Sequence, residues 1–144
     1  MNKLLIALVI GLAGCASSSL PPELEGKNSF EQTSPLPYQE AYRIISRQMR
    51  VCYEKVGAGG KNGYDVVSNI DAAGRRATIN AFYYGLFSGP NPEDSSLSRK
   101  VTLTPADSGS TIVTSGSHSK HVYETHLSIR SWLSGVETCN PTSL

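Results

Sequence analysis

Apolar side chains recur at steps of three and four residues in two stretches of the chain, and this spacing predicts two amphipathic helices. The first stretch opens at Pro37 and ends near Tyr53, with an apolar stripe of Tyr38, Ala41, Tyr42, Ile45, Met49 and Cys52. The second stretch follows Ser117 and Ser119, either of which can act as its N-cap, and ends near Gly135. Its apolar face comprises Val122, His126, Ile129, Leu133 and Val136.

The residues between these helices show the two-residue period of β-strands. Alternating positions over 64–71 and 76–84 flank a turn at Ala73 and Gly74, which predicts a hairpin. Two more strands are expected over 99–104 and 110–115, after a polar surface loop over 88–98. The pattern therefore predicts an α+β fold in the order helix, four-stranded antiparallel meander, helix, with both helices packed on one face of the sheet.

The start of the chain is typical of a secretory signal. Lys3 precedes an apolar run over residues 4–12, which is much shorter than the about 20 residues of a membrane-spanning helix. The run ends in Leu12-Ala13-Gly14-Cys15, a tetrapeptide that resembles the lipobox of bacterial lipoproteins. An ordinary signal peptide with a cysteine at its end by chance is the alternative.

The resemblance implies an attachment and an address. In bacterial lipoproteins the lipobox cysteine receives a diacylglycerol, the signal is cut before it, and the new amine is acylated, which would anchor Cys15 in a lipid bilayer. Ala16 stands where an Asp would imply retention in the inner membrane, so the resemblance implies the periplasmic face of the outer membrane. The expected organisation is a signal peptide over 1–14, a lipidated cysteine with a flexible tether over 15–35, and one α+β domain over 36–141.

Cysteine usage predicts one disulfide bond. With Cys15 committed to lipid, Cys52 and Cys139 remain as an even pair in an oxidising compartment. Two separately buried thiols are the alternative. Short connections would place the ends of the two helices at opposite edges of the sheet, so the segments around both cysteines must run back along the sheet to form the bond.

The composition and motifs point away from several activities. The chain has 13 basic and 12 acidic residues, so it lacks the excess of positive charge that is typical of proteins that bind nucleic acid. His118, His121 and Glu124 are neighbours near the second helix, as metal ligands can be, but they match no recognised zinc pattern and His126 lies on the apolar stripe. No nucleophile motif is present. We therefore expect no metal, no cofactor and no enzymatic activity.

Aromatic residues provide the strongest signal for binding. Consecutive aromatics on a strand project to both faces, so we expect Phe82, Tyr84 and Phe87 to form a partner surface. Coverage of these rings by an edge loop or by the 88–98 segment is the alternative. The sequence favours a non-enzymatic envelope module that contacts another envelope protein through this sheet face or the 88–98 loop. The alternative is a module that binds a lipid, glycan or small molecule between helices and sheet.

The layout and anchor also resemble the helix-and-sheet domains of outer-membrane accessory lipoproteins such as BamC, and this resemblance implies a role in envelope assembly.

Overall fold

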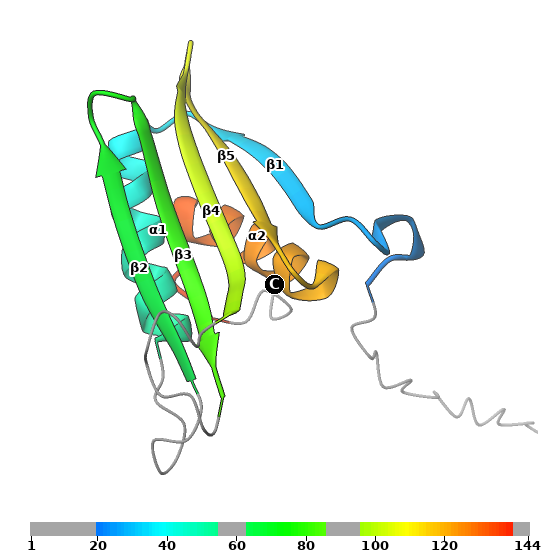
Figure 1. Cartoon of the computed structure of the whole chain (residues 1–144). Coiled ribbons are helices and arrows are strands. Elements are labelled where there is room, and N and C mark those ends of the chain that lie inside the picture. Colours follow the sequence, from blue (N-terminus) through cyan, green and yellow to red (C-terminus); the bar gives the residue numbers. More distant parts are fainter. Residues whose placement is uncertain (1–19, 55–62, 86–95, 140–144) are drawn as a thin grey trace, which may run out of the picture.

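The computed structural model describes residues 20–54, 63–85 and 96–139, and these form an antiparallel sheet with two helices on one of its faces (Figure 1). The five strands lie in the order β1-β5-β4-β3-β2. In chain order the elements are a short 3-10 helix η1 (Pro22–Leu24), β1 (Ser29–Ser34), α1 (Tyr38–Tyr53), β2 (Gly63–Asp71), β3 (Arg76–Tyr84), β4 (Ser96–Ala106), β5 (Gly109–Gly116) and α2 (Ser119–Leu133). The α+β class is confirmed, and the sheet has one strand more than the predicted meander.

The additional strand, β1, pairs antiparallel with β5 at one edge of the sheet, with Phe30 opposite Thr114. The prediction of a flexible tether over 15–35 is therefore wrong for residues 29–34. The strand carries a weak sequence signal because Phe30 is its only large apolar residue and alternate positions face solvent. Backbone pairing and packing of the Phe30 ring against Tyr123, with centroids 5.3 Å apart, hold it in place.

The helix α1 matches the predicted range, because its period brings one face onto the sheet. Tyr38, Ala41, Ile45, Met49 and Cys52 are buried along that face. Pro37 is the N-cap and not the first helical residue, and the helix ends at the predicted Tyr53. The helix packs mainly on β2 and β3, whereas α2 packs on β1 and β5, so the two helices lie side by side over different halves of the sheet (Figure 1).

The core lies between the helices and the inward positions of the strands. Its buried strand residues alternate with more exposed ones, as the two-residue period requires. They are Val66 on β2, Ala77, Ile79 and Ala81 on β3, Val101 and Leu103 on β4, and Ile112 on β5. The turn between β2 and β3 is closed by the backbone amide of Gly74, which donates to Asp71 Oδ1 at 2.9 Å. The predicted hairpin is therefore confirmed.

The strand β4 begins at Ser96, three positions before the predicted start, because its pairing with β3 continues beyond a β-bulge. Ala81 lies opposite Arg99 and Phe82 lies opposite Leu97, so Ser98 has no partner on β3. A bulge breaks the alternation of side chains locally. Ser98 and Arg99 are consequently both buried, although they are neighbours on one strand. Residues 96–98, which were expected in the surface loop, belong to the sheet.

The helix α2 ends as predicted and begins differently. Gly135, at a positive φ of 90°, follows the last turn, and the amide of Val136 donates to the carbonyl of Ser131 at 3.0 Å, which is the Schellman arrangement. At the other end His118 is the N-cap and makes no capping hydrogen bond through its side chain. Neither Ser117 nor Ser119 is the N-cap that the sequence predicted, and the Ser119 hydroxyl donates to Asn28 Oδ1 at 2.9 Å. Within the described residues, no helix is long and apolar enough to cross a membrane.

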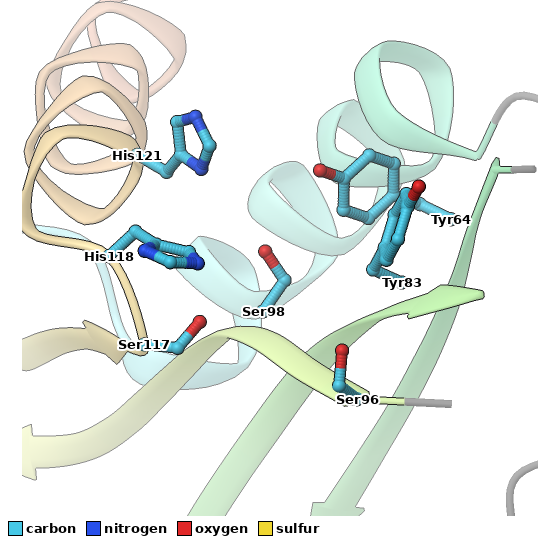
Figure 2. A pocket seen from close by; sticks show the side chains of 7 residues that line it. All are labelled: Tyr64, Tyr83, Ser96, Ser98, Ser117, His118 and His121. Atoms are coloured by element: carbon cyan, nitrogen blue, oxygen red, sulfur yellow. The ribbon is translucent and has the colours of Figure 1, made fainter. Parts of the chain in front are cut away.

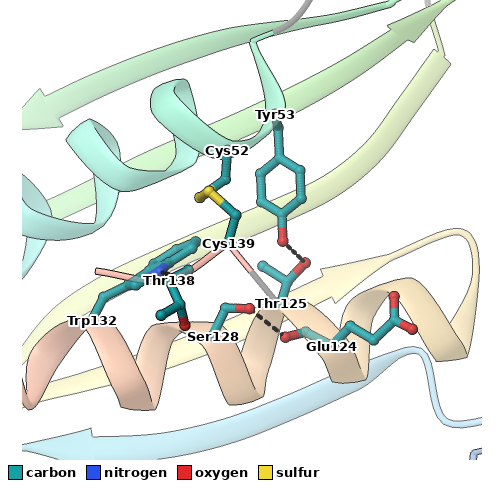
Figure 3. The surroundings of a disulfide bond; sticks show 8 residues. All are labelled: Cys52, Tyr53, Glu124, Thr125, Ser128, Trp132, Thr138 and Cys139. Carbon is teal, nitrogen blue, oxygen red and sulfur yellow. Dashed lines mark hydrogen bonds between the residues drawn. A yellow bond between two sulfur atoms is a disulfide. The ribbon is translucent and has the colours of Figure 1, made fainter. Parts of the chain in front are cut away.

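A disulfide bond joins Cys52 to Cys139, as the sequence predicted, with the two Cα atoms 5.2 Å apart (Figure 3). Cys52 lies in the last turn of α1, and Cys139 lies in the segment that follows α2. That segment returns over α2, where the Trp132 indole Nε1 donates to the Thr138 carbonyl at 2.8 Å. The Schellman turn and this hydrogen bond bring Cys139 to α1.

Candidate functional site

A pocket of about 220 Å³ opens at one end of the layer between α2 and the sheet (Figure 2). We call it the α2 pocket, and its lining comprises Tyr64 on β2, Tyr83 on β3, Ser96 and Ser98 on β4, and Ser117, His118 and His121 at the start of α2. In Figure 2 the two tyrosines face the two histidines across the pocket, and Ser98 lies between them. The tyrosine rings are packed together, with centroids 5.4 Å apart.

Arg99 lies directly against this pocket and is buried, with a relative exposure of 6%. Its guanidinium carbon is 4.5 Å from the centre of the Tyr53 ring and 5.2 Å from that of the Tyr64 ring. Its Nη1 donates a long hydrogen bond, 3.4 Å, to Ser98 Oγ. Tyr64 and Ser98 both line the pocket, so the guanidinium contacts two residues of the pocket wall. The bulge in β4 explains how a serine and an arginine at consecutive positions share this side of the sheet.

The two pocket histidines lie on the first turn of α2, with ring centroids 5.7 Å apart. Burial lowers the pKa of His121 below its usual range, and the positive charge of Arg99 lowers the pKa further, against an opposing effect of Glu124. At neutral pH His121 therefore offers one N–H donor and one nitrogen acceptor. Among residues 20–54, 63–85 and 96–139, no three His, Cys, Asp or Glu side chains are grouped closely enough to hold a metal ion.

Two hydrogen bonds connect the end of α1 to the pocket helix, and Figure 3 shows the one between Tyr53 and Thr125. The Thr125 hydroxyl donates to the carbonyl of His121 at 2.8 Å, so the Tyr53 hydroxyl, 3.2 Å from Thr125 Oγ1, is the donor of the second bond. The Tyr53 ring also packs on Arg99. One tyrosine therefore fixes the arginine on one side of the pocket and the helix that carries His121 on the other.

The residues expected to form a partner surface lie in different environments. Tyr84 is buried, with a relative exposure of 5%, and Phe82 is half-buried. Tyr83, between them, is 39% exposed and lines the α2 pocket. Phe87 and Cys15 lie outside the described residues.

His126 is apart from the other two histidines. It is buried beneath Phe30 and Tyr123, with centroids 5.6 and 6.5 Å away, as its place on the apolar stripe indicated. Burial lowers its pKa below the usual range, and the positive charge of Arg130 contributes in the same direction. Its Nδ1 has no hydrogen-bond partner within the described part of the chain. Its position makes it a residue of the core and not of the pocket.

Arg99 was not identified from the sequence as a site residue, although the sequence does carry a signal for it. It occupies the same alternating set of positions as Val101 and Leu103, which face the core. A charged residue in such a set is rarely buried without a special role. Tyr64, Tyr83 and the serines are brought together by the fold, and no local sequence pattern indicates that they lie close to one another.

Comparisons of this chain with models of protein families, with curated proteins and with solved structures found no match. The function must therefore be argued from the residues of the site.

Proposed function

We propose that the protein is a non-enzymatic lipoprotein, anchored through Cys15 in the outer membrane and facing the periplasm, that binds a small molecule in the α2 pocket. The observation that carries the proposal is the pocket itself, which lies between helix and sheet and joins two aromatic rings to hydroxyl and imidazole groups. Ligand sites combine apolar walls with a few converging polar groups in this manner. The volume of about 220 Å³ is below the roughly 300–1,000 Å³ of sites for drug-sized ligands, so the ligand, or the part that enters, is small.

Binding is a better account of this pocket than catalysis. Among the described residues, neither His118 nor His121 shares a hydrogen bond with Ser98 or Ser117, so no serine is activated by a base in the arrangement that nucleophilic catalysis needs. The Ser98 hydroxyl instead accepts a hydrogen bond from Arg99. These groups are placed to hold and orient a ligand.

Native mass spectrometry of the full-length protein, released gently from its own membranes, tests the binding function. We expect an additional small mass that is lost on denaturation. Ser117→Trp should abolish it, because Ser117 is an exposed residue at the pocket and an indole there fills the space. Ser108→Trp, in the exposed turn between β4 and β5 at the other end of β5, is the matched control and should retain the ligand. A wild-type protein without any bound mass, or a ligand retained by Ser117→Trp, would contradict the proposal.

The anchor is tested separately through Cys15. A mature protein with acyl chains on this residue should remain with membranes, because more than one chain gives stable attachment. Cys15→Ser should remove labelling by a fatty-acid probe and leave the protein uncut or soluble. Mass spectrometry of the N-terminal peptide is the direct measurement. An unmodified thiol at Cys15 would rule out this address.

A second candidate function, docking of another envelope protein, is supported by an apolar pair on the other face of the sheet. Phe82 lies directly opposite Leu97, which is 40% exposed, and Val67 on the neighbouring β2 is 48% exposed. A photo-crosslinking residue at Leu97 should capture a defined partner in intact cells, whereas the same residue at Thr104, elsewhere on β4, should not. Equal crosslinking at both positions would eliminate this candidate.

A further inference from the structure

We infer that the α2 pocket recognises an oxyanion, a carboxylate or phosphate group carried by a small organic ligand, and that Arg99 binds it. The inference rests on the proposed function and names the chemical class of its ligand. Three features of the site support it: an arginine that is buried without an acidic partner, an uncapped helix N-terminus at the same place, and a hydroxyl whose hydrogen is free to donate.

The first feature is the missing counter-charge of Arg99. A buried charge is strongly destabilising unless it is paired or fully hydrogen-bonded. Within the described residues the ion pairs are Arg47–Glu137 and Lys120–Glu124, and no carboxylate pairs with Arg99. Its buried Nε has no hydrogen-bond partner there either. The site therefore holds a positive charge that an incoming anion would neutralise.

The tyrosine rings do not remove this need. Tyr53 and Tyr64 interact with the guanidinium through their ring faces, at 4.5 and 5.2 Å. Such contacts are worth about 0.5–2 kcal/mol, and a ring face supplies no oxygen acceptor. Nη1 donates its long hydrogen bond to Ser98 Oγ, and Nε has no partner among the described residues. A guanidinium presents these N–H groups in a planar fork that matches a carboxylate or a phosphate. The rings hold Arg99 in position, and a ligand oxyanion would complete its hydrogen bonding.

The second feature is the N-terminus of α2, a helix of 15 residues. The first backbone N–H groups of a helix carry a partial positive charge and bind anions when no side chain caps them. Here the N-cap His118 makes no capping bond, and the first turn contains no acidic residue. His118, His121 and Ser117 at this end all line the α2 pocket. The helix dipole and Arg99 therefore favour negative charge at the same place.

The third feature is the direction of the hydrogen bond at Ser98. Since Arg99 Nη1 donates to Ser98 Oγ, the hydroxyl hydrogen is left to donate to another acceptor. Figure 2 shows this hydroxyl between the histidines and the tyrosines. The group at that position in a bound ligand should be an acceptor, as an oxyanion is. The rings of Tyr64 and Tyr83 then form an apolar wall, against which an apolar or cyclic part of the ligand can pack.

Calorimetric titration of the full-length protein in a neutral detergent tests the inference with three probes that carry the same phenyl ring. The probes are benzyl alcohol, benzoate and phenyl phosphate, which differ in charge and share the ring. We expect at least one of the two anions to bind about tenfold more tightly than the alcohol, as for a charge-assisted hydrogen bond. The better anion identifies a carboxylate or a phosphate as the natural group. Inorganic phosphate that binds as tightly as phenyl phosphate would overturn the assignment to an organic ligand.

Variants of Arg99 assign the anion to this residue. Arg99→Gln should remove the preference for the anions, whereas Arg76→Gln, an exposed strand arginine at the other end of β3, should retain it. If Arg99→Gln does not fold, Ser98→Ala, which keeps the charge, should weaken the anions severalfold and leave the alcohol unchanged. Equal affinity for alcohol and anions overturns the inference and leaves the proposed ligand-binding function standing. Absence of binding by every probe also overturns it, and native mass spectrometry then decides on the proposed function independently.

Discussion

The guanidinium carbon of Arg99 lies 4.5 Å from the centre of the Tyr53 ring, although the two residues belong to a strand and to the end of a helix on opposite sides of the core. The Tyr53 hydroxyl also reaches Thr125 on α2 at 3.2 Å. Tyr53 is therefore the residue that connects both helices to the buried charge, and its ring and its hydroxyl have separate roles.

Replacement of Tyr53 separates these roles. Tyr53→Phe should lower the free energy of unfolding by about 1 kcal/mol, because it removes one hydrogen bond and keeps the ring over Arg99. Tyr53→Leu should lower it by about 1–2 kcal/mol more, because the contact with the guanidinium is also lost. Urea denaturation of the three proteins provides the measurement. Equal stability of the two variants would mean that the ring contact contributes nothing.

Removal of the disulfide bond should loosen the segment after α2. Double replacement of Cys52 and Cys139 by Ala should destabilise the fold by about 2–5 kcal/mol, since the bond closes a long loop. The chain has one tryptophan, Trp132, which is 2% exposed and bonded to the Thr138 carbonyl. Its fluorescence should shift to the red when this segment is released. Cys15→Ser is the control and should alter neither stability nor fluorescence.

Gly116 lies where the bulge of β4, the end of β5 and α2 approach one another. A Cβ at this position would collide with the Ser98 carbonyl and lie 2.9 Å from Val122 Cγ2. The Ser98 carbonyl belongs to the backbone of β4 and cannot turn aside as a side chain can. Gly116→Ala should therefore lower the free energy of unfolding by about 1–3 kcal/mol and displace Ser98 in the pocket wall. Gly74→Ala is the matched control, because its Cβ would meet only the exposed side chain of Asp71, which can turn aside at the cost of one hydrogen bond. Thermal unfolding should show a clearly larger loss for Gly116→Ala.

The elements with regular periods were predictable from the sequence. The stripe of α1 and the alternation of β2 and β3 each result from burial of one face, so hydrophobic spacing alone defines them. The disulfide bond was also predictable, because the lipobox resemblance assigns Cys15 to lipid and so leaves Cys52 and Cys139 as a pair. Strand β1 was missed because an edge strand with one half-buried ring needs little apolar spacing, and its stability comes from backbone pairing with β5.

The pocket could not be predicted in the same way. Tyr64, Ser98 and His121 belong to three separate elements, and only the strand order brings them together. The bulge at Ser98 has no sequence signature, yet it determines that Arg99 and its neighbour are buried together. The sequence shows the two histidines only as neighbours along the chain, and the structure places them opposite two tyrosines.

The free energy of unfolding should fall as the pH becomes mildly acidic, because two histidines, His126 and His121, bind protons less readily in the fold than in the unfolded chain. The pKa of His126 is lowered by burial and by Arg130. The pKa of His121 is lowered by burial and by Arg99, with smaller opposing and supporting effects of Glu124, His118 and Lys120. An unfolded histidine has a pKa of about 6.5. Between that value and the lower folded value, the unfolded chain binds more protons, so protonation favours unfolding.

The free energy of unfolding should therefore be greatest above about pH 7, decline as the pH falls through about 6.5, and level off below the folded pKa values. His126→Phe keeps an aromatic ring between Phe30 and Tyr123 and removes one titrating group, so it should reduce the slope. His121→Gln should reduce it further, and the double variant should be nearly flat until the carboxylates titrate. Urea denaturation at a series of pH values measures the slope. A wild-type protein that becomes more stable on mild acidification would show that these histidines are charged in the fold, and would contradict the burial that the structure assigns to them.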